Sequence, residues 1–154
     1  MINAMDARTR RTIRKLENAF IDILETKNID DVSVSEICSN AHVNRTTFYR
    51  YYRNQYALLE MIEKELFASL YTTDDIISLL TAMRKRKKEW KRIIHLKGRG
   101  CVAENLSVIF SDRIKSRFTV SGICGSIAWW IESDMKESPE AFGRYLSDAS
   151  GFEL

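Results

Sequence analysis

The sequence contains little that would interrupt a helix and few residues that could build a chemical centre. Its 154 residues include one proline, six glycines, three cysteines and two histidines. With so few helix-breaking residues, and no alternating apolar and polar run bounded by hairpin dipeptides, it predicts an all-α protein. It has no stretch of 18 apolar residues, and residues 1–15 lack the apolar core of a secretory signal. We therefore expect a cytoplasmic protein without a membrane span.

The cysteines and histidines are too scattered for a metal centre or a disulfide framework. Cys38, Cys101 and Cys124 lie in no CxxC or CxH arrangement. His95 and Cys101 are close in sequence, but a Cys–His nucleophile needs a third orienting group and a pocket, which the pattern does not supply. We expect no metal, no cofactor and no catalytic residue, and we expect Cys38 and Cys124 to be core residues.

The first third of the chain predicts one longer helix followed by two short ones. The longer helix is expected over about residues 7–26, because apolar side chains recur there at three- and four-residue steps. Ser33 and Glu36 have the spacing of a capping box, which predicts a short helix to about Asn40. Asn44 is a favourable N-cap for the next helix, over residues 45–52. Later helices are expected near residues 54–71, 73–96, 101–117, 119–136 and 139–149.

Two runs of positive charge stand out. The first helix carries Arg8, Arg10, Arg11, Arg14 and Lys15. Cations at a helix N-terminus oppose the macrodipole, so this cluster indicates either an external anion or a solvated face. Residues 84–92 hold seven cations among nine residues. That run fits a second nucleic-acid or acidic-partner patch, but apolar residues at helical spacing through it favour the solvated side of a core helix.

Two short helices with a four-residue connection, preceded by a longer helix, are the parts of a helix-turn-helix. The second helix of that motif is polar at its N-terminal end, which enters the major groove. Phe48 and Tyr52 lie four residues apart and would anchor this helix to the core. The remaining Arg, Thr and Tyr side chains suit guanine edges, thymine methyl groups and phosphates. Packed aromatic and solvated polar side chains would account for the same segment without DNA.

Several stretches, in order and without a gap over about residues 8–66, resemble the DNA-binding domain of TetR-family regulators. They are Leu16 and Phe20, Val34-Ser35-Glu36-Ile37, residues 41–52 (AHVNRTTFYRYY) and Ala57-Leu58-Leu59. The resemblance implies a three-helix helix-turn-helix head, residues 1–53, and a short antiparallel helical body for effector binding and dimerisation, residues 54–154.

The resemblance also implies which residues contact DNA. The implied base contacts are Arg45, Thr46 and Thr47. The implied backbone contacts are Ser33, Tyr49, Arg50, Tyr51 and Gln55. The chain departs from the family at His42, where the family usually has a glycine with positive φ, a conformation that histidine tolerates better than most residues. It also departs at Gln55, where the family favours a lysine, so one phosphate-neutralising charge is lost.

The end of the chain carries a second, shorter likeness. Residues 122–132, followed by residues 135–140, resemble the final helix pair of a TetR subgroup that includes regulators of dihydroxyacetone kinase operons. Gly122 and Gly125 share one helical side with Ala128 or Trp129. We predict that this helix and the next form a two-fold dimer interface, with tryptophans packed in the monomer core as the alternative. The predicted interface residues are Gly122, Gly125, Trp129 and Phe142.

Together these features predict a homodimeric transcriptional regulator, a repressor, that binds a palindromic double-stranded operator through helices about 34–36 Å apart. An effector, either a small molecule or a protein, would bind the body and release the DNA. Three alternatives stay open. The chain could be a protein-binding co-regulator or activator of the same fold without a small-molecule pocket, a shortened member that binds DNA constitutively, or, remotely, an enzyme.

Overall fold

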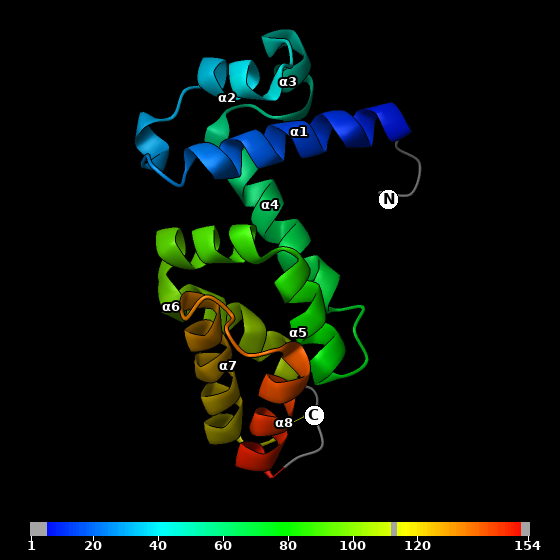
Figure 1. The fold of residues 1–154 in the computed structure, drawn as a ribbon, viewed down its shortest axis with the longest axis vertical. Helices are drawn as coiled ribbons and strands as arrows, with labels where there is room; N and C mark the ends of the chain where they lie inside the picture. Colours follow the sequence, from blue (N-terminus) through cyan, green and yellow to red (C-terminus); the bar gives the residue numbers. More distant parts are fainter. Residues whose placement is uncertain (1–5, 112–113, 152–154) are drawn as a thin grey trace. The chain divides into compact units, whose positions relative to one another are not determined.

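The protein is all-helical in the ranges that the computed structural model describes, residues 6–111 and 114–151 (Figure 1). This confirms the fold class. The elements are α1 (Ala7–Ile23), a 3₁₀ turn η1 (Ile29–Asp31), α2 (Val34–Ala41), α3 (Arg45–Tyr51), α4 (Gln55–Leu70), α5 (Ile76–Lys85), α6 (Lys87–Ser111), α7 (Arg117–Glu132) and α8 (Pro139–Ser150). No helix within those ranges is long and apolar enough to cross a bilayer.

The chain divides into two compact units, and the division falls inside α4. The N-terminal unit is Met1–Ile62 and the C-terminal unit is Glu63–Leu154. The first therefore contains α1, α2, α3 and the start of α4, and the second contains the remaining helices. The functional boundary expected between residues 53 and 54 stays a prediction.

The core of the N-terminal unit takes one apolar stripe from each of its helices. Leu16 and Phe20 of α1, Ile37 of α2, Phe48 of α3 and Leu58 of α4 are completely buried. Each fully buried aliphatic or aromatic side chain stabilises the folded state by about 1.5–3 kcal/mol relative to its exposed state. This core holds α2 against α1 and α3 against α2, and so determines which side of α3 faces the solvent.

The helix starts in this unit follow the expected capping chemistry, with one correction. The Ser33 hydroxyl accepts a hydrogen bond from the backbone N–H of Glu36 at 3.2 Å. A capping box also predicts that the Glu36 carboxylate accepts from the backbone N–H of Ser33. This half of the prediction is wrong, because the Glu36 carboxylate accepts from the Lys27 ammonium at 2.6 Å. The ammonium group is charged and therefore a stronger donor than a neutral amide. The first helix also ends earlier than expected, at Ile23, and Lys27 lies in the turn that follows.

The C-terminal unit is a helical bundle in which α6 packs along α7 and α5 packs against α8 (Figure 1). Trp90 of α6 and Trp130 of α7 are buried in its core. Gly143 of α8 allows the close approach to α5, because a Cβ at this position would lie 3.0 Å from the Ile77 side chain. The expected start of α8 is confirmed: Ser138 is the N-cap and Pro139 is the first helical residue.

One expected helix boundary in this unit is wrong, and one expected break is confirmed. The single helix predicted over 73–96 is two helices, because the backbone leaves helical geometry at Arg86 (φ −117°, ψ 39°). Here the Arg86 guanidinium pairs with Glu89 at 2.9 Å and Glu65 at 3.8 Å, and Glu65 lies too far away in the sequence for a periodicity argument to include it. The break expected at 97–100 is confirmed, because the backbone of Gly98 (φ 82°, ψ 162°) is non-helical and interrupts α6. A glycine adopts this φ without steric cost.

The helices expected over 101–117 and 119–136 differ in their ends. The first is the C-terminal part of α6 and ends at Ser111, and residues 112–113 of the expected helix lie outside the described residues. The second is α7, which begins at Arg117 behind the N-cap Ser116 and ends at Glu132. Ser116 accepts from the backbone N–H of Thr119 at 3.3 Å. This cap fixes the start two residues earlier than expected.

Candidate nucleic-acid and dimer interfaces

Helix α3 is anchored by its aromatic residues, as expected. Phe48 and Tyr52 are buried, and their ring centroids lie 5.5 Å apart. The Tyr49 and Phe48 rings are nearly perpendicular, with 5.6 Å between their centroids. The Asn44 side chain caps the helix by accepting from the backbone N–H of Thr46 at 2.8 Å. Two buried rings therefore determine the rotation of α3 about its axis, and the Asn44 cap determines the residue at which the helix begins.

The structure brings the predicted base-contacting residues together at the N-terminal end of α3. Arg45 and Thr46 are exposed, and Thr47 is half-buried. Along the rest of the helix, Tyr49 and Arg50 are exposed and Tyr51 is half-buried. Short polar side chains and an arginine thus occupy the end that a helix-turn-helix inserts into the major groove.

The turn between α2 and α3 has the left-handed conformation that the sequence predicts at His42 (φ 52°, ψ 47°). The backbone N–H of Val43 donates to the Cys38 carbonyl at 2.9 Å, and the N–H of His42 donates to the Ser39 carbonyl at 3.1 Å. These two bonds form a Schellman motif, which ends α2 and turns the chain sharply. Histidine therefore holds the backbone geometry that the family usually builds with glycine.

The start of α4 adds a polar cluster beside α3. Asn54 caps the helix by accepting from the backbone N–H of Ala57 at 2.9 Å, and Gln55 is its first residue. The Tyr56 hydroxyl donates to Asp30 at 2.6 Å and so joins α4 to η1. Sequence reasoning missed Arg53, which is exposed immediately before the cap. A cation next to a predicted helix start was the signal that could have found it.

The N-terminal unit also matches a known family. Residues 21–62 match the model of the bacterial regulatory proteins of the tetR family. Residues 21–62 therefore have a TetR-type helix-turn-helix. Over 59 residues the chain is 37% identical to the HTH-type dhaKLM operon transcriptional activator DhaS of Lactococcus lactis subsp. lactis (strain IL1403). This alignment covers 38% of the chain, and it spans only about a third of the relative's length, 32%.

Two solved structures share the fold over nearly the whole chain. The dihydroxyacetone kinase operon activator DhaS superposes with a TM-score of 0.67 and 22% identity, over 93% of this chain and 98% of that one. The fatty acid degradation regulator FadR from Bacillus halodurans superposes with a TM-score of 0.59 and 13% identity, over 90% and 94% of the two chains. The helical body behind the TetR-type head therefore has the architecture of the bodies in these regulators.

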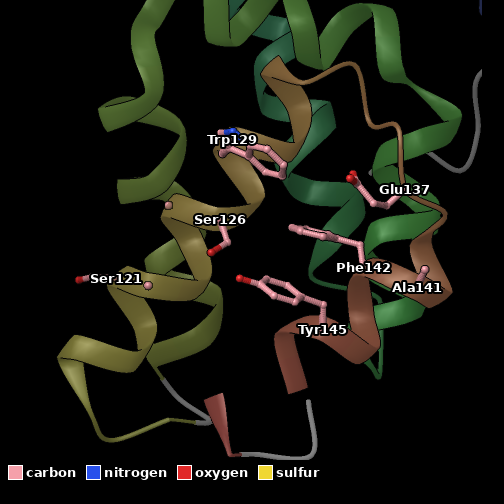
Figure 2. A pocket seen from close by; sticks show the side chains of 9 residues that line it. Ser121, Ser126, Trp129, Glu137, Ala141, Phe142 and Tyr145 are labelled. Atoms are coloured by element: carbon pink, nitrogen blue, oxygen red, sulfur yellow. The ribbon is translucent and has the colours of Figure 1, made fainter. Parts of the chain in front are cut away.

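An open groove of about 680 Å³ lies between α7 and α8 of this body (Figure 2). Trp129 and Ser126 project from α7, Phe142 and Tyr145 project from α8, and Glu137 lies at one end. All four residues of the predicted dimer interface line it: Gly122, Gly125, Trp129 and Phe142. The structure thus places these residues on one surface, and their role as an interface stays a prediction.

The side of α7 that borders this groove is apolar and exposed. Gly122 and Gly125 are exposed, and a Cβ at either position would have no neighbour within 4 Å. Nothing inside the described chain therefore requires glycine there. Phe118 is 90% exposed and Trp129 is 48% exposed, on the same helical side. Sequence reasoning missed Phe118, although it precedes Gly122 by four residues, the spacing of one helical face.

The adjacent tryptophans of α7 have different environments. Trp130 is buried and stacks on Phe142, with 5.1 Å between the ring centroids. Phe142 in turn stacks on Tyr145, which is 60% exposed. Trp130 is thus the monomer-core residue that the alternative expectation described, whereas Trp129 projects into the groove. Phe142 belongs to both environments, because it packs in the core and also lines the groove.

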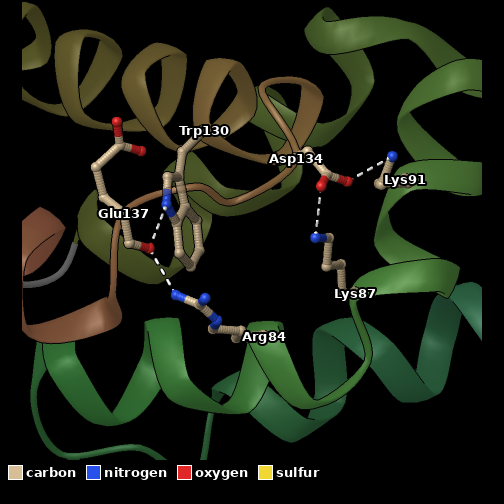
Figure 3. Close-up of polar contacts among 6 residues, drawn as sticks. All are labelled: Arg84, Lys87, Lys91, Trp130, Asp134 and Glu137. Atoms are coloured by element: carbon tan, nitrogen blue, oxygen red, sulfur yellow. Dashed lines mark hydrogen bonds and ion pairs between the residues drawn. The ribbon is translucent and has the colours of Figure 1, made fainter.

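Part of the basic run at residues 84–92 holds the α7–α8 connection in place (Figure 3). The Lys87 and Lys91 ammonium groups pair with the two carboxylate oxygens of Asp134 at 2.8 and 2.7 Å. Arg84 donates to the Glu137 carbonyl oxygen at 2.7 Å, and the Trp130 indole N–H donates to the same oxygen at 3.2 Å. As expected, the run lies on the solvated side of its helices, because Met83, Trp90 and Ile94 are buried. Three of its cations also bond to this connection. They attach α5 and α6 to the segment that ends the groove.

Asp134 should make the stability of this connection depend on pH. Hydrogen bonds from Lys87 and Lys91 lower the pKa of its carboxyl from 3.8 to about 2. Because the pKa of Asp134 is lower in the folded chain, its ion pairs contribute fully to the free energy of unfolding above about pH 4, the ordinary pKa of an unfolded aspartate. This contribution is lost as the pH falls toward 2. The free energy of unfolding of Asp134→Asn, from denaturant titrations, should lie below wild type at pH 6, and the difference should shrink between pH 4 and pH 2.

Asparagine suits this test because it tolerates the left-handed backbone of Asp134 (φ 68°). Asp148→Asn is the matched control, because Asp148 is exposed on α8 and makes no ion pair in the described part of the chain. A difference between wild type and Asp134→Asn that stays constant down to pH 2 would show that the ion pairs contribute nothing to folding.

The remaining titratable groups form no centre of their own. Cys38 and Cys124 are buried, which confirms them as core residues. Burial raises the pKa of the Cys124 thiol to about 11 and keeps it protonated. Cys101 is half-buried and lies 3.9 Å from the Glu63 carboxylate. No group of three or more potential metal ligands occurs among the residues that the structure describes.

Proposed function

We propose that this chain regulates transcription by binding double-stranded DNA as a homodimer. The observation that carries the proposal is the N-terminal end of α3, where Arg45, Thr46 and Thr47 lie on the outer surface of a TetR-type head while Phe48 is buried. Both similar regulators named DhaS are described as activators of an operon, which supports a role at a promoter.

Different residues of the head contact the DNA bases and the DNA backbone. Arg45 donates to a guanine edge, and Thr46 and Thr47 contact adjacent bases. The phenol groups of Tyr49 and Tyr51 donate to phosphates on either side of the groove. The remaining phosphate contacts are Arg50, Gln55 and Ser33. The Ser33 hydroxyl oxygen accepts from the Glu36 N–H, so its own proton is available to a phosphate oxygen.

The homodimer forms through α7 and α8. The groove between these helices is bordered by exposed apolar side chains and by two glycines that this chain's own packing does not need. A second copy related by a two-fold axis would cover Phe118, Trp129 and Tyr145, and the glycines would let its helices approach closely. The two heads would then address two half-sites of a palindrome.

We also propose that the chain represses transcription and that an effector releases it from the operator. Activation is the alternative to repression. Activation is favoured by the names of the DhaS proteins. A co-regulator that works through another protein is the second candidate, favoured by the position of the open groove on the proposed dimer surface. A groove covered by a second copy would leave no separate small-molecule site there.

Sedimentation and reconstituted transcription test this proposal together. The free chain should sediment as a dimer, and two chains should bind one operator duplex. Transcript yield from a promoter that carries the operator should fall for a repressor and rise for an activator. A protein co-regulator would leave the yield unchanged until its partner is added. A monomer that binds no duplex would contradict the proposal.

A further inference from the structure

One strongly charged surface of the N-terminal unit is not part of the DNA and dimer contacts proposed above. Helix α1 carries five cations within eight residues, and all five are exposed: Arg8, Arg10, Arg11, Arg14 and Lys15. A shallow hollow on this helix is lined by Ala7, Arg10, Arg11, Arg14, Lys15 and Asn18. Because positions 7, 11, 14 and 18 share one helical side, the hollow follows a single face of α1. We call this surface the α1 basic face.

The positive charge of this face is not neutralised within the described chain. None of its five side chains makes an ion pair or donates a hydrogen bond to another described residue. The basic run at residues 84–92 is the internal contrast, because Lys87 and Lys91 share Asp134 and Arg86 pairs with Glu89. Of the two basic runs, one therefore makes ion pairs within the chain and the other is left with its charge facing solvent.

The location of these cations also counts against a role in folding. They occupy the first turns of α1, and the first turn contains no acidic residue. Each cation close to a helix N-terminus destabilises the helix by about 0.3–1 kcal/mol through the macrodipole. An anion held against the face would reverse this cost. The flat, exposed arrangement of several arginines fits phosphate oxygens spaced along a strand better than one small buried anion.

We propose that the α1 basic face binds the phosphate backbone of the operator where the duplex continues past the half-site read by α3. This inference rests on the proposed function. Helices α1 and α3 belong to one compact unit of 62 residues, for which a radius of gyration of about 11 Å is expected. One helical turn of DNA is about 34 Å long, so a duplex seated on α3 extends beyond this unit. The contact adds affinity without base preference, and it offsets the charge missing at Gln55.

The salt dependence of DNA binding measures this contact. In the triple variant Arg10→Gln, Arg11→Gln and Arg14→Gln, the slope of log Kobs against log salt should become shallower by about 0.9 for each phosphate that the variant no longer neutralises. The largest change is roughly 2.7 for each head, or about 5.4 for the dimer. Affinity for cognate and random duplexes should fall by the same factor, and the selected base motif should not change. Shortening the duplex flanks should weaken binding of wild type and have little effect on the variant.

The control is a second triple variant with the same change in net charge, Lys85→Gln, Lys115→Gln and Lys136→Gln, whose positions are exposed in the C-terminal unit. Circular dichroism and thermal melting verify that both variants fold. If wild type binds duplex and both variants show the same slope, this inference fails while the proposed function stands. That result is also expected if the face binds an acidic protein. If wild type binds no duplex, both fail.

Discussion

Gly125→Glu is expected to convert the dimer into monomers. In the single chain a side chain at this position meets open space, so the substitution should leave the fold intact. In a two-fold interface it would bury two unpaired carboxylates close to each other. Leaving a charge buried without a partner costs about 3–5 kcal/mol, which corresponds to at least about 100-fold in the dimer dissociation constant. Sedimentation velocity over a dilution series measures the constant directly.

Ala68→Glu provides the matched control, because it places the same acid at an exposed position of α4 within the C-terminal unit. It should remain a dimer with wild-type affinity for the operator. Gly125→Glu should also lose operator affinity, since one head contacts only one half-site. A Gly125→Glu protein that sediments as wild type would place the dimer interface elsewhere, and would leave the groove between α7 and α8 without an assigned occupant.

Arg45→Ala is expected to weaken binding to the preferred operator by about 1–3 kcal/mol, or roughly 5- to 150-fold, for each half-site. Arg45 is exposed at the first position of α3, where a guanidinium can donate two hydrogen bonds to one guanine. Its loss should therefore relax base preference at one position of each half-site. Fluorescence anisotropy titrations with the operator, and with duplexes changed at single positions, measure both effects.

Arg50→Ala distinguishes base recognition from charge. Arg50 lies on the same helix and is also exposed, but its proposed contact is a phosphate. Its loss should weaken binding to every duplex by a similar factor and make the salt slope shallower by about 0.9 for each head, or about 1.8 for the dimer. Equal losses on operator and random DNA for Arg45→Ala would show that Arg45 contacts phosphate only. The base contacts would then have to come from Thr46 and Thr47.

The sequence could predict most of the head because its structure depends on local chemistry. The cap at Asn44, the left-handed turn at His42, and the four-residue spacing of Phe48 and Tyr52 each involve neighbours in the chain. Such features can be recognised from residue type and spacing alone. The candidate DNA-contacting surface followed from them, because burying two rings determines which side of α3 is left exposed.

The body was harder to predict because distant residues decide its details. The break at Arg86 coincides with an ion pair to Glu65, and the cations of the basic run find Asp134 more than 40 residues away. The spacing of apolar and charged residues along the chain cannot identify ion-pair partners that are distant in the sequence. Likewise, it did not establish that Trp130 stacks on Phe142 in the core while Trp129 projects into the groove.

The most direct test of the account is selection of bound sequences from a pool of random duplexes by the purified chain. We expect enrichment of a palindrome whose half-sites lie about one helical turn, roughly 34 Å, apart. Enrichment of a single half-site would keep the DNA-binding head but contradict the dimer. No enrichment at moderate salt, from protein verified as a folded dimer, would contradict the central claim that α3 reads DNA.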